Sequence, residues 1–361
     1  MESNSLEPTH LLRELDLQPF RQRFPWIGAD LQTLRDTLRR DPLGPDCGTP
    51  IPIPIGPSES LLAMLDPAPG ADPLGLVVLM HGLGGSSERE GLRRMGQALQ
   101  QAGFSVLRLN MRGAGPGRHL ARGTYAANSN RDLLPVLHQA RELAQGRPLL
   151  GMGISLGGTK LLNALLSGPG LLDALVTISS PLDLEGCSRQ IELPRNRLYQ
   201  HWLLKRLVDQ TLADPFGVSP EERRALLEPG PRTIREFDAS ITAPRWGYPS
   251  VEEYYRQASP LAALLQGAVE FPPCLIVHAE DDPWVPVAPA RQLLEAQIPA
   301  LQVLLTPQGG HNGFHGPKGC WGDQLTAGWL RRQVASASQS TAQLGFPRSG
   351  APSGSARSAP G

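Results

Sequence analysis

The sequence predicts an α/β fold in which a mostly parallel central sheet carries helices on both faces and a helical cap covers one edge. Two observations lead to this prediction. From Leu74 onward, short apolar runs alternate with longer segments that have helical spacing of their apolar residues, and this alternation is typical of parallel sheets covered on both sides. The alternation stops at Pro181 and resumes after about Pro260, which indicates an inserted cap.

The individual elements follow from hydrophobic spacing and from the positions of Pro and Gly. We expect core strands at 76–80, 104–109, just before Ser155, 174–178, 274–278 and 301–305. Core helices are expected at 88–102, 130–145, just after Ser155, 287–297 and 321–334, and cap helices at 196–212, 220–227 and 251–256. Strand 51–55 alternates isoleucine with proline, so it can only be an edge strand, paired with 60–65.

The chain is expected to divide into three parts. Residues 1–50 form an N-terminal extension with one or two helices, 51–335 form the main domain with its cap at about 181–260, and 336–361 form a tail. In the extension, several leucines are spaced to pack on the body: Leu11, Leu12, Leu15, Leu17, Leu31, Leu34 and Leu38. The tail is almost entirely Ser, Ala, Gly, Pro and Gln, and we expect it to be disordered because it cannot bury enough apolar surface.

Composition excludes several classes of function. The 34 basic and 34 acidic residues balance, so no nucleic-acid or anionic-membrane partner is indicated. The four cysteines have neither disulfide nor metal spacing, and no metal or cofactor motif is present, so none is expected. Without a signal peptide or an apolar run long enough to span a bilayer, the protein is expected to be cytoplasmic. The oligomeric state is not readable.

The pattern Gly153-x-Ser155-x-Gly157 joins a predicted strand to a predicted helix. A serine at such a corner has strained backbone angles, and the small residues on either side let strand and helix approach. Its hydroxyl would stand above the sheet at a helix N-terminus, where negative charge is favoured. Alone, the pattern would also fit a glycine-rich turn that carries a solvated serine.

A nucleophilic serine needs a base and an acid that orients the base. Asp281 and Asp282 follow the strand at 274–278, and Asp282, just before a proline, is the preferred acid, with Asp281 as the competitor. His311 follows two glycines after the last strand and is the preferred base, with His315 as a minor alternative. The chain order Ser, Asp, His is typical of hydrolases with a strand-to-helix nucleophile.

The segment His81-Gly82-Leu83-Gly84-Gly85 follows the strand at 76–80. We expect the backbone N–H groups of Leu83 and Leu156 to form an oxyanion hole, since donors from these two places can face the developing charge. The segment lacks the Lys-Ser/Thr of a phosphate-binding loop. His81 is expected to brace the loop.

Taken together, these motifs resemble the YheT-like branch of the α/β-hydrolases over roughly residues 20–332. The segments that carry the resemblance include Arg23-Phe24-Pro25-Trp26, Leu31-Gln32-Thr33-Leu34, His81-Gly82-Leu83-Gly84-Gly85, Asn110-Met111-Arg112-Gly113, Gly153-Ile154-Ser155-Leu156-Gly157-Gly158, Thr233-Ile234-Arg235-Glu236-Phe237-Asp238, Asp281-Asp282-Pro283 and Gly309-Gly310-His311. The resemblance implies an α/β-hydrolase fold, a charge relay of Ser155, Asp282 and His311, and esters of short or medium acyl chains or lipids as substrates. For Arg112 and Asp238 two roles stay open, a structural one, which is preferred, and a place in the wall of the pocket.

Three functions fit these observations. The first is a serine hydrolase that cleaves carboxylic esters through an acyl-enzyme. The second is an acyltransferase in which an alcohol takes the acyl group from the same intermediate. The third is a ligand-binding protein that keeps the fold without catalysis.

Overall fold

The computed structural model describes residues 8–267 and 269–343. Their main feature is an eight-stranded sheet with the order β1-β2-β4-β3-β5-β6-β7-β8. All neighbouring strands from β4 to β8 are parallel, and β2 is the strand that runs antiparallel to both of its neighbours, β1 and β4. The predicted α/β-hydrolase fold with a mostly parallel sheet is therefore confirmed. The strands are β1 (Thr49–Pro54), β2 (Ser60–Asp66), β3 (Leu76–Met80), β4 (Ser105–Leu109), β5 (Leu149–Ile154), β6 (Ala174–Ile178), β7 (Cys274–Ala279) and β8 (Leu301–Thr306).

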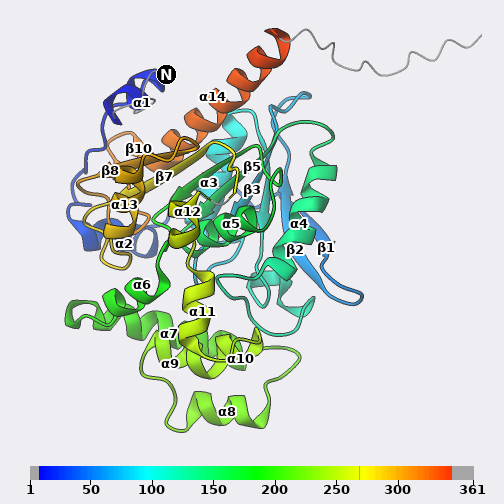
Figure 1. The fold of residues 1–361 in the computed structure, drawn as a ribbon, viewed down its shortest axis with the longest axis vertical. Coiled ribbons are helices and arrows are strands. Elements are labelled where there is room, and N and C mark those ends of the chain that lie inside the picture. The colour runs from blue at the N-terminus through cyan, green and yellow to red at the C-terminus, as the bar shows by residue number, and fades with distance from the viewer. Residues whose placement is uncertain (1–7, 268, 344–361) are drawn as a thin grey trace, which may run out of the picture.

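Helices cover both faces of the sheet (Figure 1). Successive side chains of a strand point to opposite faces, and β3 shows the result: Val77 and Leu79 belong to one apolar cluster, and Val78 and Met80 to the other. The first cluster includes side chains of α3 (Glu90–Gln101) and α14 (Trp321–Gln343). The second includes side chains of α4 (Asn130–Leu143), α5 (Leu156–Ser167) and α13 (Ala288–Ala296).

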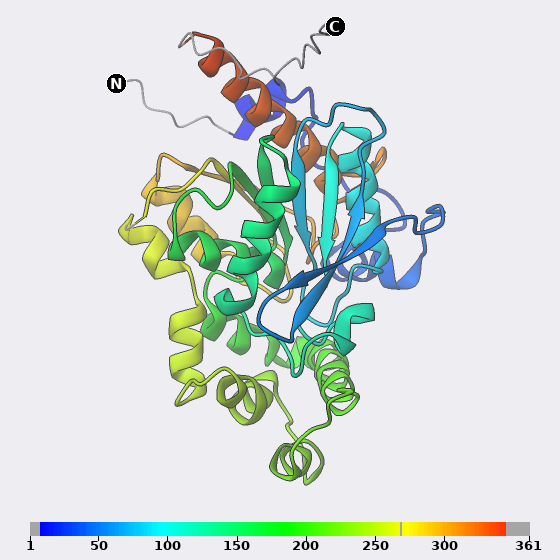
Figure 2. The same cartoon turned by 90° about the vertical axis from the view of Figure 1, so that its right-hand side faces the viewer.

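The proline-rich strand β1 lies at the edge of the sheet, as predicted. Figure 2 looks at this edge, with the blue hairpin of β1 and β2 in front. Because proline has no N–H to donate, Pro50, Pro52 and Pro54 are compatible with a strand that has a neighbour on one side only. The strand begins at Thr49, so the predicted domain boundary at residue 51 falls inside it.

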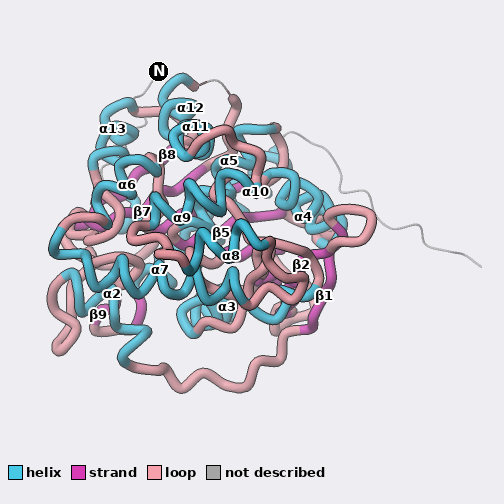
Figure 3. The backbone as a smooth tube through the Cα atoms, turned by 90° about the horizontal axis from the view of Figure 1, so that it is seen from below, coloured by secondary structure: helices cyan, strands magenta, loops and turns pink. Residues whose placement is uncertain are grey.

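The helices between β6 and β7 lie together beyond the sheet, and Figure 3 shows them from below. They have an apolar cluster of their own, to which Leu204, Leu207 and Phe237 belong. The sequence predicted three of these helices and missed four. Three of the missed helices have only 3 to 6 residues, too few for a periodic signal, but the fourth, at 184–191, is as long as two of the predicted ones. The helices between β6 and β7 are α6 (Leu184–Ile191), α7 (Arg197–Leu212), α8 (Pro220–Leu227), α9 (Ile234–Phe237), α10 (Ala243–Arg245), α11 (Val251–Ala258) and α12 (Leu261–Gln266).

The N-terminal extension forms α1 (Pro8–Glu14) and α2 (Ala29–Leu38). Leu11 and Leu12 of α1 are buried, as expected. In α2 the prediction is wrong for Leu31 and Leu38, which are 39% and 62% exposed, while Gln32 and Arg35 are buried. The reason is that α2 lies against polar backbone and charged groups, which need hydrogen-bonding partners rather than apolar contacts.

Helix α14 continues past the predicted start of the disordered tail at 336 and ends at Gln343. The boundary at 336 is therefore wrong, because a formed helix extends cheaply through a segment without Pro or Gly. Residues 344–361 of the predicted tail lie outside the described residues. Among the helices that are described, none is long and apolar enough to cross a membrane.

Candidate active site

Ser155 lies at the corner between β5 and α5 with a positive φ of 52° and a ψ of −125°. This conformation is rare for a residue with a side chain and is retained only where the surroundings enforce it. The flanking glycines are needed for space. A Cβ at Gly157 would lie 2.6 Å from the Met80 carbonyl oxygen, and one at Gly153 would collide with the backbone of Gly158. The sequence pattern thus produces the predicted strand-to-helix corner.

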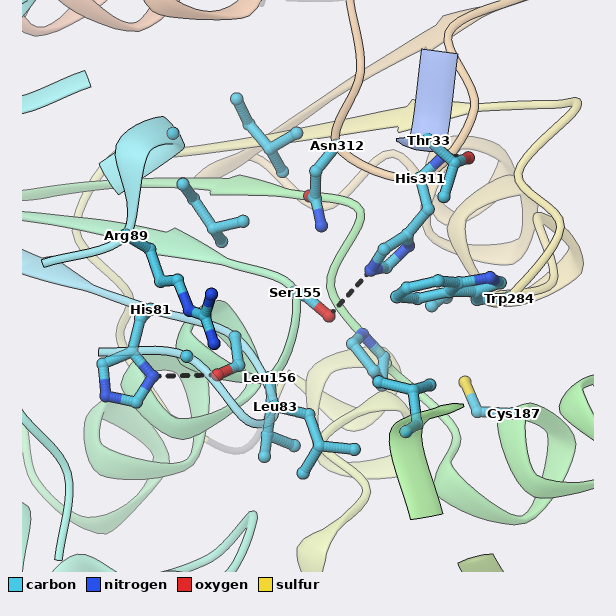
Figure 4. Close-up of a pocket in the computed structure, with 18 of the residues that line it drawn as sticks. Thr33, His81, Leu83, Arg89, Ser155, Leu156, Cys187, Trp284, His311 and Asn312 are labelled. Carbon is cyan, nitrogen blue, oxygen red and sulfur yellow. Dashed lines mark hydrogen bonds between the residues drawn. The ribbon is translucent and has the colours of Figure 1, made fainter. Parts of the chain in front are cut away.

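Two loops bring Asp282 and His311 to this corner. Asp282 follows β7 and His311 follows β8, so both lie at the carboxyl ends of strands parallel to β5. His311 Nε2 lies 3.0 Å from Ser155 Oγ (Figure 4). His311 Nδ1 lies 2.9 Å from Asp282 Oδ2. The other oxygen, Asp282 Oδ1, accepts hydrogen bonds from the N–H groups of Trp284 and Val285 at 2.8 and 3.0 Å.

Asp282 is fully buried, and its charge is stabilised by its partners. Burial acts to raise the pKa of its carboxyl, but the neighbouring His311, by charge and hydrogen bond, outweighs burial and holds the pKa below the usual aspartate value. Asp282 is therefore ionised at neutral pH and can orient the imidazole of His311.

The competing residues Asp281 and His315 have other contacts. Asp281 Oδ1 accepts a hydrogen bond from the N–H of Gly310 at 2.8 Å, so it holds the loop that carries His311. His315 Nε2 lies 3.1 Å from Asp36. Of the candidates that the sequence left open, Asp282 and His311 are the ones that the structure brings to Ser155.

The loop of Leu83 lies directly against the serine, since a Cβ at Gly82 would be 3.0 Å from Ser155 Cβ. Within the described part of the chain, no hydrogen bond uses the N–H of Leu83 or of Leu156. Both residues line the cavity above Ser155. These two N–H groups are therefore available to an oxygen bound there.

His81 braces this loop. Its Nδ1 lies 2.8 Å from the Gly82 carbonyl oxygen, and its Nε2 lies 3.2 Å from the backbone nitrogen of Met111, which donates to it. Burial lowers the pKa of His81 to about 4, so the ring is neutral at pH 7 and can donate from one nitrogen and accept at the other. In the same loop, the N–H of Gly84, the residue after Leu83, donates to the Tyr125 hydroxyl at 2.6 Å.

A cavity of about 350 Å³ opens over Ser155. Its size falls within the range of small-molecule sites, which are mostly apolar with a few polar groups. The apolar side chains that the inserted helices contribute to it include Leu184, Ile191, Leu203, Leu207 and Phe237.

Sequence reasoning missed three residues around His311. The indole of Trp284 lies against the imidazole with ring centroids 4.5 Å apart, and its position two residues after Asp282 was the available signal. Thr33 and Ser179 accept hydrogen bonds from the backbone of the His311 loop. Thr33 lies in one of the segments that carry the family resemblance, but both residues are far from His311 in the sequence, so no local pattern indicated these contacts.

The expectation for Arg112 and Asp238 has two outcomes. Arg112 is structural, because its guanidinium binds Asp132 and Glu59 and it does not line the cavity. Asp238, in contrast, lines the cavity, where it is partly buried and accepts a hydrogen bond from the Tyr255 hydroxyl at 2.8 Å. Burial is the main cause that raises the pKa of Asp238 to about 6, although the hydrogen bonds from Thr242 and Tyr255 oppose it.

This raised pKa predicts a pH-dependent loss of stability that Asp238→Asn removes. A carboxyl whose pKa is higher in the folded state stabilises the fold fully below its unfolded pKa of 3.8, and this contribution is lost as the pH rises through about 6. Between pH 4 and 7, wild type should lose roughly 2 kcal/mol of unfolding free energy relative to Asp238→Asn, at about 1.4 kcal/mol per pKa unit, since part of the unfolded-state carboxyl is already ionised at pH 4. Urea unfolding at both pH values measures the difference. The control Asp72→Asn changes an 89% exposed carboxylate, and an equal shift there would contradict the assignment.

Comparisons with known proteins show which family the chain belongs to. Residues 75–316 match the family described as alpha/beta hydrolase fold. The chain is 34% identical over 248 residues to the putative esterase YheT of Escherichia coli, which covers 66% of this chain and 70% of YheT. It is 30% identical over 252 residues to phospholipase ABHD3 of Mus musculus, covering 69% of this chain but only 60% of that protein.

Solved structures resemble the chain in fold. A 2,6-dihydroxy-pseudo-oxynicotine hydrolase superposes with a TM-score of 0.55 at 17% identity, over 85% of this chain and 72% of that one. An esterase from Pyrococcus furiosus superposes with a TM-score of 0.53 at 15% identity, over 88% and 97%. The serine corner, the sheet order and these matches show that the chain belongs to the α/β-hydrolase family, in its YheT-like branch.

Proposed function

We propose that the protein is a serine hydrolase that cleaves carboxylic esters. One observation carries the proposal: a continuous chain of hydrogen bonds runs from Ser155 Oγ through His311 to Asp282. A serine hydroxyl becomes a useful nucleophile when a base can take its proton and a carboxylate stabilises the resulting imidazolium.

The reaction follows from these contacts. Ser155 Oγ attacks the ester carbonyl carbon while His311 Nε2 takes the hydroxyl proton. The bond to the alcohol oxygen then breaks, and His311 returns the proton to the departing alcohol. In the second half, His311 takes a proton from water, the hydroxide attacks the acyl-enzyme, and the acid leaves as Ser155 regains its proton.

The charge that develops on the carbonyl oxygen needs donors in the transition state. We assign this role to the N–H groups of Leu83 and Leu156, which have no acceptor among the described residues. Donors that are already oriented cost no reorganisation at the moment of reaction, and removing one such bond costs about 3–4 kcal/mol. The tight contact of Gly82 with Ser155 supports this placement.

The substrate is proposed to be an ester of a short or medium acyl chain or a lipid. The cavity of about 350 Å³, with apolar side chains from α6, α7 and α9, supports burial of an acyl chain beside Ser155. The names of the relatives, a putative esterase and a phospholipase, point to the same bond type.

Ser155→Ala is expected to abolish ester hydrolysis, with kcat falling by at least about 10⁴-fold, because it removes the hydroxyl that His311 Nε2 holds. Hydrolysis of a short-chain nitrophenyl ester measures it, and a fluorophosphonate probe should label wild type only. Ser188→Ala is the control, since Ser188 lines the same cavity but bonds to Glu192. An active Ser155→Ala variant would refute the hydrolase proposal, and unlabelled wild type would favour a non-catalytic binding protein.

The two adjacent aspartates predict opposite results for the same substitution. Asp282→Asn should lower kcat about 10⁴-fold, because an amide cannot stabilise the imidazolium and favours the wrong tautomer of His311. Asp281→Asn should keep most of the activity, since the amide oxygen can still accept the Gly310 N–H. Equal losses in both variants would mean that the acid has been misassigned.

Acyl transfer is the second candidate function. It is favoured by the 28% identity, over 67% of this chain, with a yeast protein named medium-chain fatty acid ethyl ester synthase/esterase 2, of which the match covers 58%. The acyl-enzyme would be the same, but an alcohol would attack it in place of water. In water containing ethanol, we expect mostly free acid, quantified by chromatography of the products. Ethyl ester as the main product would favour transfer.

A further inference from the structure

We propose that helix α2 of the N-terminal extension is a positioning element for His311, and that the Thr33 hydroxyl is the group through which it acts. The inference rests on the proposed function, because it assigns a role to α2 in the same reaction. Thr33 Oγ1 accepts a hydrogen bond from the backbone N–H of His311 at 2.8 Å. In Figure 4, Thr33 lies beside the backbone of His311, on the side away from Ser155.

The loop that carries His311 needs external support because its backbone is strained. Gly309, Gly310, Asn312 and Phe314 all have positive φ angles, of 154°, 59°, 57° and 52°. Such angles are costly for Asn and more so for a bulky residue such as Phe, and they persist only where the surroundings enforce them. Contacts to other segments must therefore hold this loop in the conformation that directs the imidazole at Ser155.

Three successive N–H groups of the loop are each held by a side chain from a different segment. The N–H of Gly310 donates to Asp281 and that of Asn312 to Ser179, both of which lie in loops after core strands. The N–H between them, that of His311, donates to Thr33 of α2. The restraint on the proposed base itself thus comes from the N-terminal extension.

The Thr33 hydroxyl is oriented for this role. It donates its own hydrogen to the carbonyl oxygen of Ala29 at 2.8 Å, one turn earlier in α2. With that hydrogen committed, a lone pair of Oγ1 is left to accept from His311. Valine has the same shape without the acceptor, whereas serine keeps the acceptor.

Gln32 and Asp36 hold the far end of the loop. The Gln32 carboxamide accepts from the N–H of His315 at 2.8 Å and donates to the carbonyl oxygen of the same residue at 3.1 Å. Asp36 binds the His315 ring and also the guanidinium of Arg94 on α3. These contacts explain why α2 turns a polar face inward.

The loop and α2 are pressed together at two glycines. A Cβ at Gly310 would lie 2.8 Å from Thr33 Oγ1, and one at Gly313 would lie 2.7 Å from the Gln32 carbonyl oxygen. Helix α2 is itself fixed to the body, because Arg94 connects Asp36 to Asp323 of α14. A rigid helix in such close contact can transmit its position to the imidazole. Helix α2 lies outside residues 75–316, the part of the chain that matches the α/β-hydrolase family model.

The test compares Thr33→Val with Thr33→Ser in the full chain. Thr33→Val leaves the His311 N–H without its acceptor. The loss of a hydrogen bond of this kind corresponds to about a threefold to tenfold change in a rate or equilibrium constant. We expect kcat per active site, titrated with a fluorophosphonate, to fall about fivefold with KM within about twofold of wild type, because Thr33 acts through His311. Thr33→Ser should restore kcat. If Thr33→Val does not fold, Thr33→Ala takes its place in the comparison.

A matched control separates positioning from general stability. Thr326 is buried in α14 and donates to Gly322, also four residues earlier, but accepts nothing from the His311 loop. Thr326→Val should leave kcat per active site unchanged. Unchanged kcat in Thr33→Val, an equal loss in Thr33→Ser, or an equal loss in Thr326→Val would overturn the inference. Any of these results, together with an inactive Ser155→Ala variant, would refute the role of Thr33 and leave the hydrolase proposal intact. An active Ser155→Ala variant would refute the hydrolase proposal.

Discussion

The hydrogen bond between Ser155 and His311 is the interaction on which the rest of the structure depends. It joins residues 156 positions apart, and a span of about 3 Å leaves little tolerance for movement. Parallel strands meet this requirement because their carboxyl ends share one edge of the sheet. Strands β5, β7 and β8 end there, and the loops that follow them carry Ser155, Asp282 and His311.

Backbone strain recurs at the points where these side chains are displayed. Ser155, Ser179, Asn312 and Phe314 all have positive φ angles, and each belongs to the serine corner or to the loops around His311. Such strain persists when neighbouring hydrogen bonds and close packing outweigh it. The glycines at 157 and 310 serve the same arrangement, since any side chain there would strike the neighbouring backbone or α2.

The chemistry and the substrate fit are divided between two parts of the fold. The sheet and its loops supply the proposed reacting groups, while the helices between β6 and β7 supply a large share of the apolar wall of the cavity. Asp238 is a polar exception in that wall, and its burial beside Tyr255 makes its charge costly near neutral pH. Variation in the inserted helices can therefore change the substrate without disturbing the hydrogen-bond chain at Ser155.

The sequence by itself determined the α/β fold, the edge position of β1 and the candidate residues Ser155, Asp282 and His311, because strand periodicity, proline and the glycine-flanked serine act over short stretches of chain. It left Asp281 and His315 open, since adjacent residues in one loop carry the same local signal. Only the tertiary structure showed that Asp282 contacts His311 and that His311 contacts Ser155. It also showed which face of α2 is buried and that Thr33 meets the His311 backbone. The contact of Thr33 with the His311 backbone joins residues 278 positions apart, and no local pattern encodes it.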